Sequence, residues 1–141
     1  MTSIRAVATL FVLLLGSLTL ASCTGGAVPP EAKPGAEAWL GIVDAGRYAD
    51  SWTEAAAYFK GAIDAKSWER QVGAVRTPLG KLQSRAVKSA KAATSLPGAP
   101  DGQYVVFQFE TSFERKETSV ETVTVSKETD GAWRVSGYYI K

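Results

Sequence analysis

The spacing of hydrophobic residues differs between two parts of the chain, and in the first part it is the spacing of a helix. Through the middle of the chain, apolar side chains recur every three or four positions, which is the spacing of one helix face. The spacing predicts helices over about 35–46, 47–61 and 64–80, with Asp64 or Ser67 as the cap of the third. The apolar stripes are Ala36, Trp39, Leu40 and Val43; then Tyr48, Trp52, Ala55 and Phe59; then Trp68, Val72 and Val75.

From residue 82 onward the period of hydrophobicity is two, as in a half-buried strand. Strands are predicted over 82–93, 104–113, 118–126 and 132–140, with glycine, proline or charged residues in the turns between them. The second of these strands has the clearest alternation. One of its faces would carry Val105, Phe107, Phe109, Thr111 and Phe113, and the other Tyr104, Val106, Gln108, Glu110 and Ser112.

The order of these elements predicts the fold class. Short links between the later strands favour an antiparallel meander, and helices that precede a sheet are typical of an α+β domain. We therefore expect N-terminal helices packed on one face of an antiparallel sheet of about four strands, all within residues 35–141.

The first 22 residues have the layout of a secretory signal peptide. Arg5 is their only charged residue, an apolar run over 6–20 follows, and small residues precede Cys23. The end of this leader resembles the lipobox of bacterial lipoproteins, which implies cleavage before Cys23 and a lipid on its thiol. The lipobox residues are Leu20, Ala21, Ser22 and Cys23.

Residues 23–34 then form a lipidated cysteine and a flexible tether, because glycine and proline dominate them and no periodicity is present. The expected location is the bacterial cell envelope, with the membrane contacted through the N-terminal lipid. If the organism has two membranes, Thr24 directly after the cysteine favours anchoring in the outer membrane, with the domain facing the periplasm.

Two other interpretations of the leader stay open. An uncleaved transmembrane helix needs about 20 apolar residues, whereas this run is shorter and contains Gly16, Ser17 and Thr19. A simple secretory signal that is cut before Cys23 also fits the small residues. The position of the only cysteine at the end of the leader favours the lipoprotein.

Composition excludes several functions. Without the 22-residue leader the 141-residue chain keeps 119 residues, enough for one domain. The leader holds one of the 16 basic residues and none of the 14 acidic ones, so the remainder has a net charge of +1, and we expect no nucleic-acid partner.

The chain has no histidine, which excludes Ser-His-Asp and Cys-His catalysis. Neither a metal motif nor a phosphate-binding glycine loop is present, so no cofactor is expected.

Ten segments of the chain resemble one bacterial family. They are Trp39-Leu40, 43–49, Ser51-Trp52, 78–80, Ser84-Arg85, 95–102, 104–106, 110–113, 121–123 and 133–140. The family is domain of unknown function 4019, to which no activity is assigned. Its layout is similar to the cone-shaped nuclear-transport-factor-2-like and cystatin-like folds, which implies helices on the concave face of a curved sheet. Enzymes of that group often use an Asp-His pair, and this chain cannot supply one.

Six residues are candidates for a pocket in the cone: Trp52, Arg76, Arg85, Glu110, Arg134 and Tyr139. Glu110 lies in mid-strand, so it is either the polar contact of a pocket or, as we favour, a half-solvated residue paired across strands. The tryptophans are interpreted as core residues, since three lie on helical stripes. Glu121 is interpreted as a solvated strand residue.

Two classes of function follow from these residues. The first is a non-enzymatic, lipid-anchored module that binds a small ligand or an envelope protein. The second is an enzyme that uses Glu110 or a tyrosine as acid or base in an aromatic pocket. A structural accessory of an envelope complex is a third hypothesis.

Overall fold

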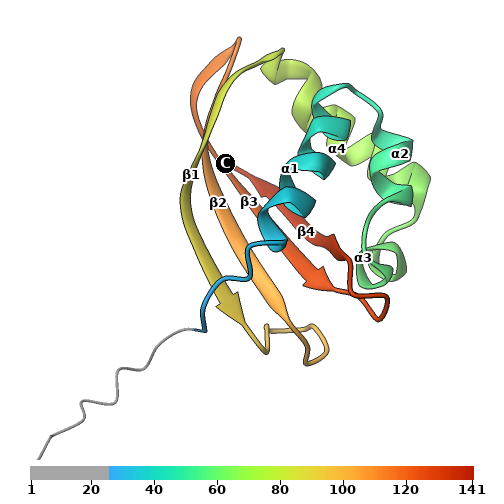
Figure 1. The fold of residues 1–141 in the computed structure, drawn as a ribbon. Coiled ribbons are helices and arrows are strands. Elements are labelled where there is room, and N and C mark those ends of the chain that lie inside the picture. The colour runs from blue at the N-terminus through green and yellow to red at the C-terminus, as the bar shows by residue number, and fades with distance from the viewer. Residues whose placement is uncertain (1–25) are drawn as a thin grey trace, which may run out of the picture.

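The computed structural model describes residues 26–141, so the predicted leader and Cys23 lie outside the described residues. Helices come first and strands follow, and the four strands pair antiparallel in chain order (Figure 1). The sheet is curved and the helices cover one of its faces. The α+β meander that the sequence predicts is confirmed. Its elements are α1 Ala32–Asp44, α2 Tyr48–Thr53, α3 Ala57–Ala62, α4 Ala65–Leu79, β1 Leu82–Ala93, β2 Tyr104–Phe113, β3 Lys116–Lys127 and β4 Trp133–Ile140.

Helix α1 begins at Ala32, inside the segment that the sequence analysis assigns to the tether. Pro34 is tolerated there because the first turn of a helix has no intrahelical acceptor for its N–H groups. Ala32 is fully buried, and its N–H donates to the carbonyl of Pro29 at 3.1 Å. The folded domain therefore extends further toward the N-terminus than residue 35.

The single helix predicted over 47–61 is wrong, because the chain forms α2 and α3 with a break between them. At the break, the N–H of Ala56 donates to the carbonyl of Val135 in β4 at 2.8 Å. Ala55 and Ala56 are fully buried, which lets the backbone approach the strand closely. A tertiary hydrogen bond thus replaces a helical one.

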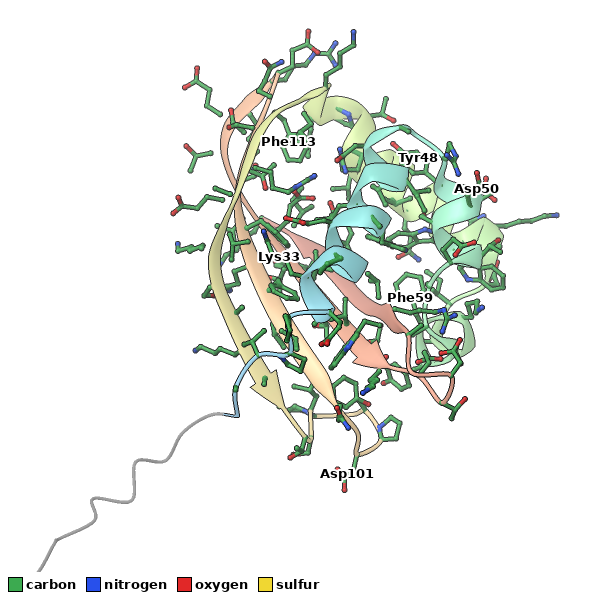
Figure 2. All side chains as sticks on the ribbon, in the orientation of Figure 1. Lys33, Tyr48, Asp50, Phe59, Asp101 and Phe113 are labelled. Atoms are coloured by element: carbon green, nitrogen blue, oxygen red, sulfur yellow. The ribbon has the colours of Figure 1, made fainter. Side chains whose placement is uncertain are left out.

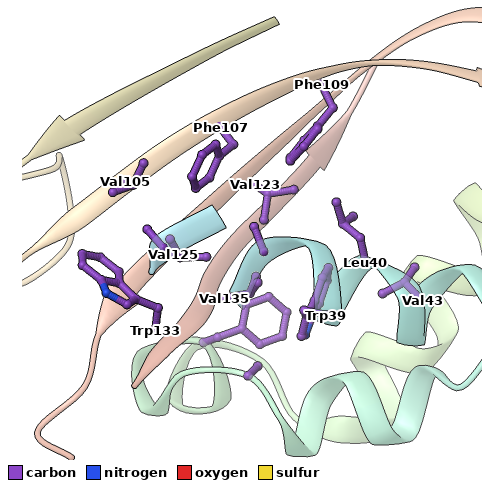
Figure 3. Packing of buried hydrophobic residues seen from close by; sticks show 14 of the residues in the cluster. Trp39, Leu40, Val43, Val105, Phe107, Phe109, Val123, Val125, Trp133 and Val135 are labelled. Atoms are coloured by element: carbon purple, nitrogen blue, oxygen red, sulfur yellow. The ribbon is translucent and has the colours of Figure 1, made fainter. Parts of the chain in front are cut away.

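The core lies between α1 and the covered face of the sheet (Figure 3). Apolar side chains at alternate positions of β2 and β3 face the helix stripe of Trp39, Leu40 and Val43. Helix α1 lies close to β4 at Gly35, where an added Cβ would meet the carbonyl oxygen of Trp133 at 2.7 Å. The buried face of β2 is the one predicted from its alternation.

A bulge in β4 changes which residues face the helices. Val125 pairs with Val135, but Val123 pairs with Tyr138, so β4 holds one extra residue between the two pairs. Side chains beyond the bulge change faces, and Tyr138 joins the covered face. Tyr139 points outward and is 62% exposed.

Aromatic rings fill the space between the helices and β4. Trp68 lies between Phe59 and Trp39, with ring centroids 4.9 and 5.8 Å away, and Tyr138 lies 5.3 Å from Trp39. These separations are those of packed aromatic pairs. The interpretation of Trp39 and Trp68 as core residues is confirmed. No helix within residues 26–141 is long and apolar enough to cross a membrane.

Candidate functional site

A buried network of charged side chains lies between the helices and the sheet at the end of the sheet marked by Phe113, opposite Asp101 (Figure 2). Six elements each contribute one residue, so the network joins both layers of the fold. We call this set the buried ionic network. Its members are Asp44 of α1, Arg76 of α4, Arg85 of β1, Thr111 of β2, Glu121 of β3 and Tyr138 of β4.

Arg85 is the centre of the network. Its Nη1 and Nη2 donate to the two carboxylate oxygens of Asp44 at 2.7 and 2.9 Å, and its Nε donates to Glu121 Oε1 at 2.7 Å. Arg85 is opposite Thr111 in the β1–β2 register, so the strand places it on the covered face. A planar guanidinium with this fork of donors suits two carboxylates at once.

Glu121 is a fully buried carboxylate with several donors. Besides Arg85, the hydroxyl of Thr111 donates to Oε1 at 2.8 Å and the phenol of Tyr138 donates to Oε2 at 2.5 Å. Its side chain has an exposed fraction of 0%. A buried carboxylate is tolerated only with such partners, because burial of an unpaired charge is very costly.

Arg76 approaches the network from α4 and is only 4% exposed. Its Nη2 donates to Asp44 Oδ1 at 2.8 Å, and its Cζ lies 4.7 Å from the ring centroid of Phe113. Its Nε and Nη1 have no hydrogen-bond partner among residues 26–141. The ring face of Phe113 replaces part of the missing solvation by a cation–π contact.

The network shifts the ionisation of its members. Burial alone would raise the pKa of Asp44, but hydrogen bonds and charge from Arg85 and Arg76 outweigh it, and the pKa lies below its ordinary value. Burial and the charge of Glu121 raise the pKa of the Tyr138 phenol well above its ordinary value. Burial alone would lower the pKa of the Arg85 guanidinium. Hydrogen bonds and charge from Asp44 and Glu121 outweigh that effect, so the pKa lies above its ordinary value and the guanidinium stays charged.

The carboxylates of the network are engaged by donors within it, whereas Arg76 keeps two donors without a partner among residues 26–141. Two carboxylates meet two guanidinium groups, and the phenol of Tyr138 is held protonated as a donor to Glu121. The carboxylates of Asp44 and Glu121 are therefore engaged by arginine, threonine and tyrosine donors. Such an arrangement holds helices on a sheet. Among residues 26–141 no group of three or more acidic or cysteine side chains is arranged to bind a metal ion.

The predicted pocket residues do not gather in one place. The structure joins Arg76 and Arg85 through Asp44. Glu110 does not lie in the covered interior, because its side chain is 68% exposed on the uncovered face of β2, where it lines a surface groove with Lys88. Its nearest opposite charge is Lys88 on β1, at 3.8 Å, which is the favoured cross-strand pairing.

The other three candidates lie apart from the network. Trp52 is partly buried, and its indole N–H donates to the carbonyl of Ile63 at 2.8 Å. Arg134 forms an exposed pair with Asp130, and Tyr139 is largely exposed on the edge strand β4. With Glu110 and Tyr139 both facing solvent, an acid or base role for them in an enclosed pocket has no geometric basis.

Sequence reasoning did not name four network members as site residues, and two of them, Asp44 and Glu121, had a local signal. Asp44 follows Leu40 by four positions, so it lies on the same helix face as the buried stripe of α1, at its end. Glu121 shares its strand parity with Val123 and Val125, which predicts the covered face. The interpretation of Glu121 as a solvated residue is wrong. Its side chain lies on the covered face of β3 and is fully buried.

The sequence matches the model of the family described as "Protein of unknown function (DUF4019)" over residues 35–138. The chain belongs to the DUF4019 family. All six residues of the buried ionic network lie within the matched part of this DUF4019 protein. A search of curated proteins returns no significant match.

Proposed function

We propose that this DUF4019 protein is a lipid-anchored component of the bacterial cell envelope that binds a protein partner through its surface. The observation that carries the binding part is the filled interior of the fold. Trp39, Phe59, Trp68 and Tyr138 pack against one another where a cone-shaped fold would otherwise be hollow. Such packing favours recognition at the surface over an enclosed small-ligand pocket.

The polar part of the interior supports the same conclusion. Carboxylates and guanidinium groups that could bind a substrate bind one another in the buried ionic network. A ligand that displaced Asp44 or Glu121 would leave a buried arginine charge without its partner, at high energetic cost. The network thus serves to keep α1 and α4 on the sheet.

The anchoring part of the proposal is supported by the sequence of the leader. The Cys23 thiol would lose its proton and form a thioether with the diacylglyceryl group of a membrane phospholipid, whose phosphate headgroup leaves. Hydrolysis of the peptide bond between Ser22 and Cys23 would then remove the leader. Kinship with the nuclear-transport-factor-2-like and cystatin-like folds also belongs to this proposal, supported by the helices on one face of a curved sheet.

Mass spectrometry of the protein from bacterial membranes tests the anchor. We expect a mature chain that begins at Cys23 and carries acyl groups, and a Cys23→Ser variant that is no longer processed to this form. Thr24→Ser is the matched control, which should be processed normally. A native chain that keeps residues 1–22, or that lacks acyl groups, would contradict the anchoring.

Photo-crosslinking in cells tests the binding mode. A photoreactive amino acid is placed at Glu110 on β2, at Tyr139 on β4 or at Tyr58 on α3, each of which is exposed. Binding of a protein predicts that one area gives a discrete crosslinked partner and the others do not. If native mass spectrometry instead finds a stoichiometric small molecule and no position gives a crosslink, the protein-binding proposal is wrong.

A further inference from the structure

A groove of about 540 Å³ opens where the segment that begins at Gly26 passes the end of the sheet farthest from the buried ionic network. It lies between that segment, the last residues of β1, and the first residues of β2 and β4. We call it the base groove. It is lined by Gly26, Ala27, Pro29, Ala92, Ala93, Thr94, Gln103, Tyr104 and Trp133.

The walls of the base groove are uncharged, since none of its lining residues is acidic or basic. Ala92 and Ala93 leave room because their side chains are single methyl groups. The hydroxyl of Tyr104 donates to the carbonyl of Pro100 at 2.5 Å, so the polar tip of this residue is already satisfied. The volume is within the usual range of small-molecule sites, about 300–1,000 Å³. This chemistry suits a hydrocarbon better than a charged or strongly polar ligand.

The chain itself brings a hydrocarbon to this place if Cys23 is acylated. Gly26 is a wall residue and follows Cys23 by three positions. Three residues span at most about 10 Å, because an extended chain covers roughly 3.3–3.6 Å per residue. A tethered group so near its site has an effective concentration on the order of millimolar or more.

We infer that the base groove receives an acyl chain of the lipid carried by Cys23. This inference rests on the anchoring in the proposed function. The groove would hold one chain against the ring of Trp133 and the methyl groups of Ala92 and Ala93. The occupied groove would also fix the orientation of the domain relative to its own lipid, because β1 ends at the groove and β2 and β4 begin there.

Quenching of tryptophan fluorescence tests this inference on the full acylated protein. Cells are fed a brominated fatty acid, and the protein is purified in a detergent without bromine, so that the only bromine is on its own lipid. Bromine quenches an indole ring at contact, and Trp133 is the tryptophan that lines the groove. We expect the emission of Trp133, measured as the difference from a Trp133→Phe variant, to be lost in the brominated protein.

A matched pair of variants assigns the quenching to the groove. Ala93→Arg fills the base groove and should restore the emission of Trp133, whereas Ala86→Arg lies on the same strand outside the groove and should leave it quenched. If the brominated lipid on the protein does not quench Trp133, the inference is overturned, even where a brominated detergent added afterwards does quench it. Mass spectrometry of the same samples separates the two proposals: without acyl groups both fail, and with acyl groups but no quenching only the groove fails.

Discussion

Two arginine–carboxylate pairs with nearly the same geometry lie in opposite surroundings in this domain. Arg85 binds Asp44 through two hydrogen bonds of 2.7 and 2.9 Å, and Arg134 binds Asp130 through two of 2.9 and 2.7 Å. The first arginine is 12% exposed and the second 34% exposed. The first pair joins a helix to a strand, whereas the second joins residues four positions apart.

The comparison shows that hydrogen-bond geometry alone does not determine how much an ion pair contributes to the free energy of unfolding. Removal of one partner from a buried pair leaves a charge without solvation, while water replaces the lost partner at the surface. The two pairs therefore predict very different consequences for the same substitution. Variants of both pairs can test this difference directly.

The largest effect is expected for Arg85→Met. This change removes the cation that lies between the partly buried Asp44 and the fully buried Glu121 and leaves the two carboxylates close together. Loss of one partner from a buried ion pair typically costs about 3–5 kcal/mol. Urea denaturation at neutral pH should therefore show the free energy of unfolding reduced by roughly this amount. A loss below about 1 kcal/mol would mean that the network contributes no more than a surface pair.

The next effect is the acid sensitivity conferred by Asp44. Its folded-state pKa lies below the ordinary value near 3.8, so the ionised carboxylate stabilises the fold. That contribution is present above the unfolded-state pKa and is lost as the pH falls through the lowered folded-state value. Urea midpoints measured from pH 6 down to pH 3 should fall in the parent and fall less in Asp44→Asn, which starts lower. Parallel curves would contradict a stabilising role for the Asp44 charge.

A smaller effect is expected for Tyr138→Phe, which removes the phenol that donates to Glu121. A hydrogen bond to a charged group contributes about 1.5–3 kcal/mol, and the ring of this residue remains in place. The parent should also lose stability as the pH rises above about 10, since the unfolded phenol ionises there while the folded one keeps its proton. Urea midpoints at pH 8 and pH 11 should show a smaller alkaline loss in the variant, with the exposed Tyr139→Phe as control.

The fold was largely predictable because its signals are local. The change of hydrophobic period from helical to two separates the helices from the strands, and the turns at Gly80 and Gly131 have the positive φ that glycine permits. The break between α2 and α3 was not predictable in this way. It depends on a hydrogen bond from Ala56 to Val135, which is distant in the sequence.

The candidate site was predictable only in part. Arg76 and Arg85 were identified as candidates, but their carboxylate partners lie 32 to 41 positions away, and no local pattern pairs them. Strict alternation along β4 from Val135 would place Tyr139 on the covered face, but the bulge places Tyr138 there instead. A glycine inside a strand is a signal for such a bulge, and Gly137 directly follows the unpaired Ser136.

The smallest effect is expected for Arg134→Met, the counterpart of Arg85→Met at the surface. The hydrogen bonds from Arg134, together with the N–H of Ala132, lower the pKa of Asp130 to about 2, so the carboxylate is ionised over the whole useful pH range. Water solvates Asp130 when the arginine is removed, because the carboxylate lies at the surface with 55% of its side chain exposed. The free energy of unfolding of the variant should therefore fall by less than about 1 kcal/mol, and by less still in 0.5 M salt, which screens surface charges. A loss comparable to that of Arg85→Met would mean that bidentate geometry, rather than burial, determines the strength of both pairs.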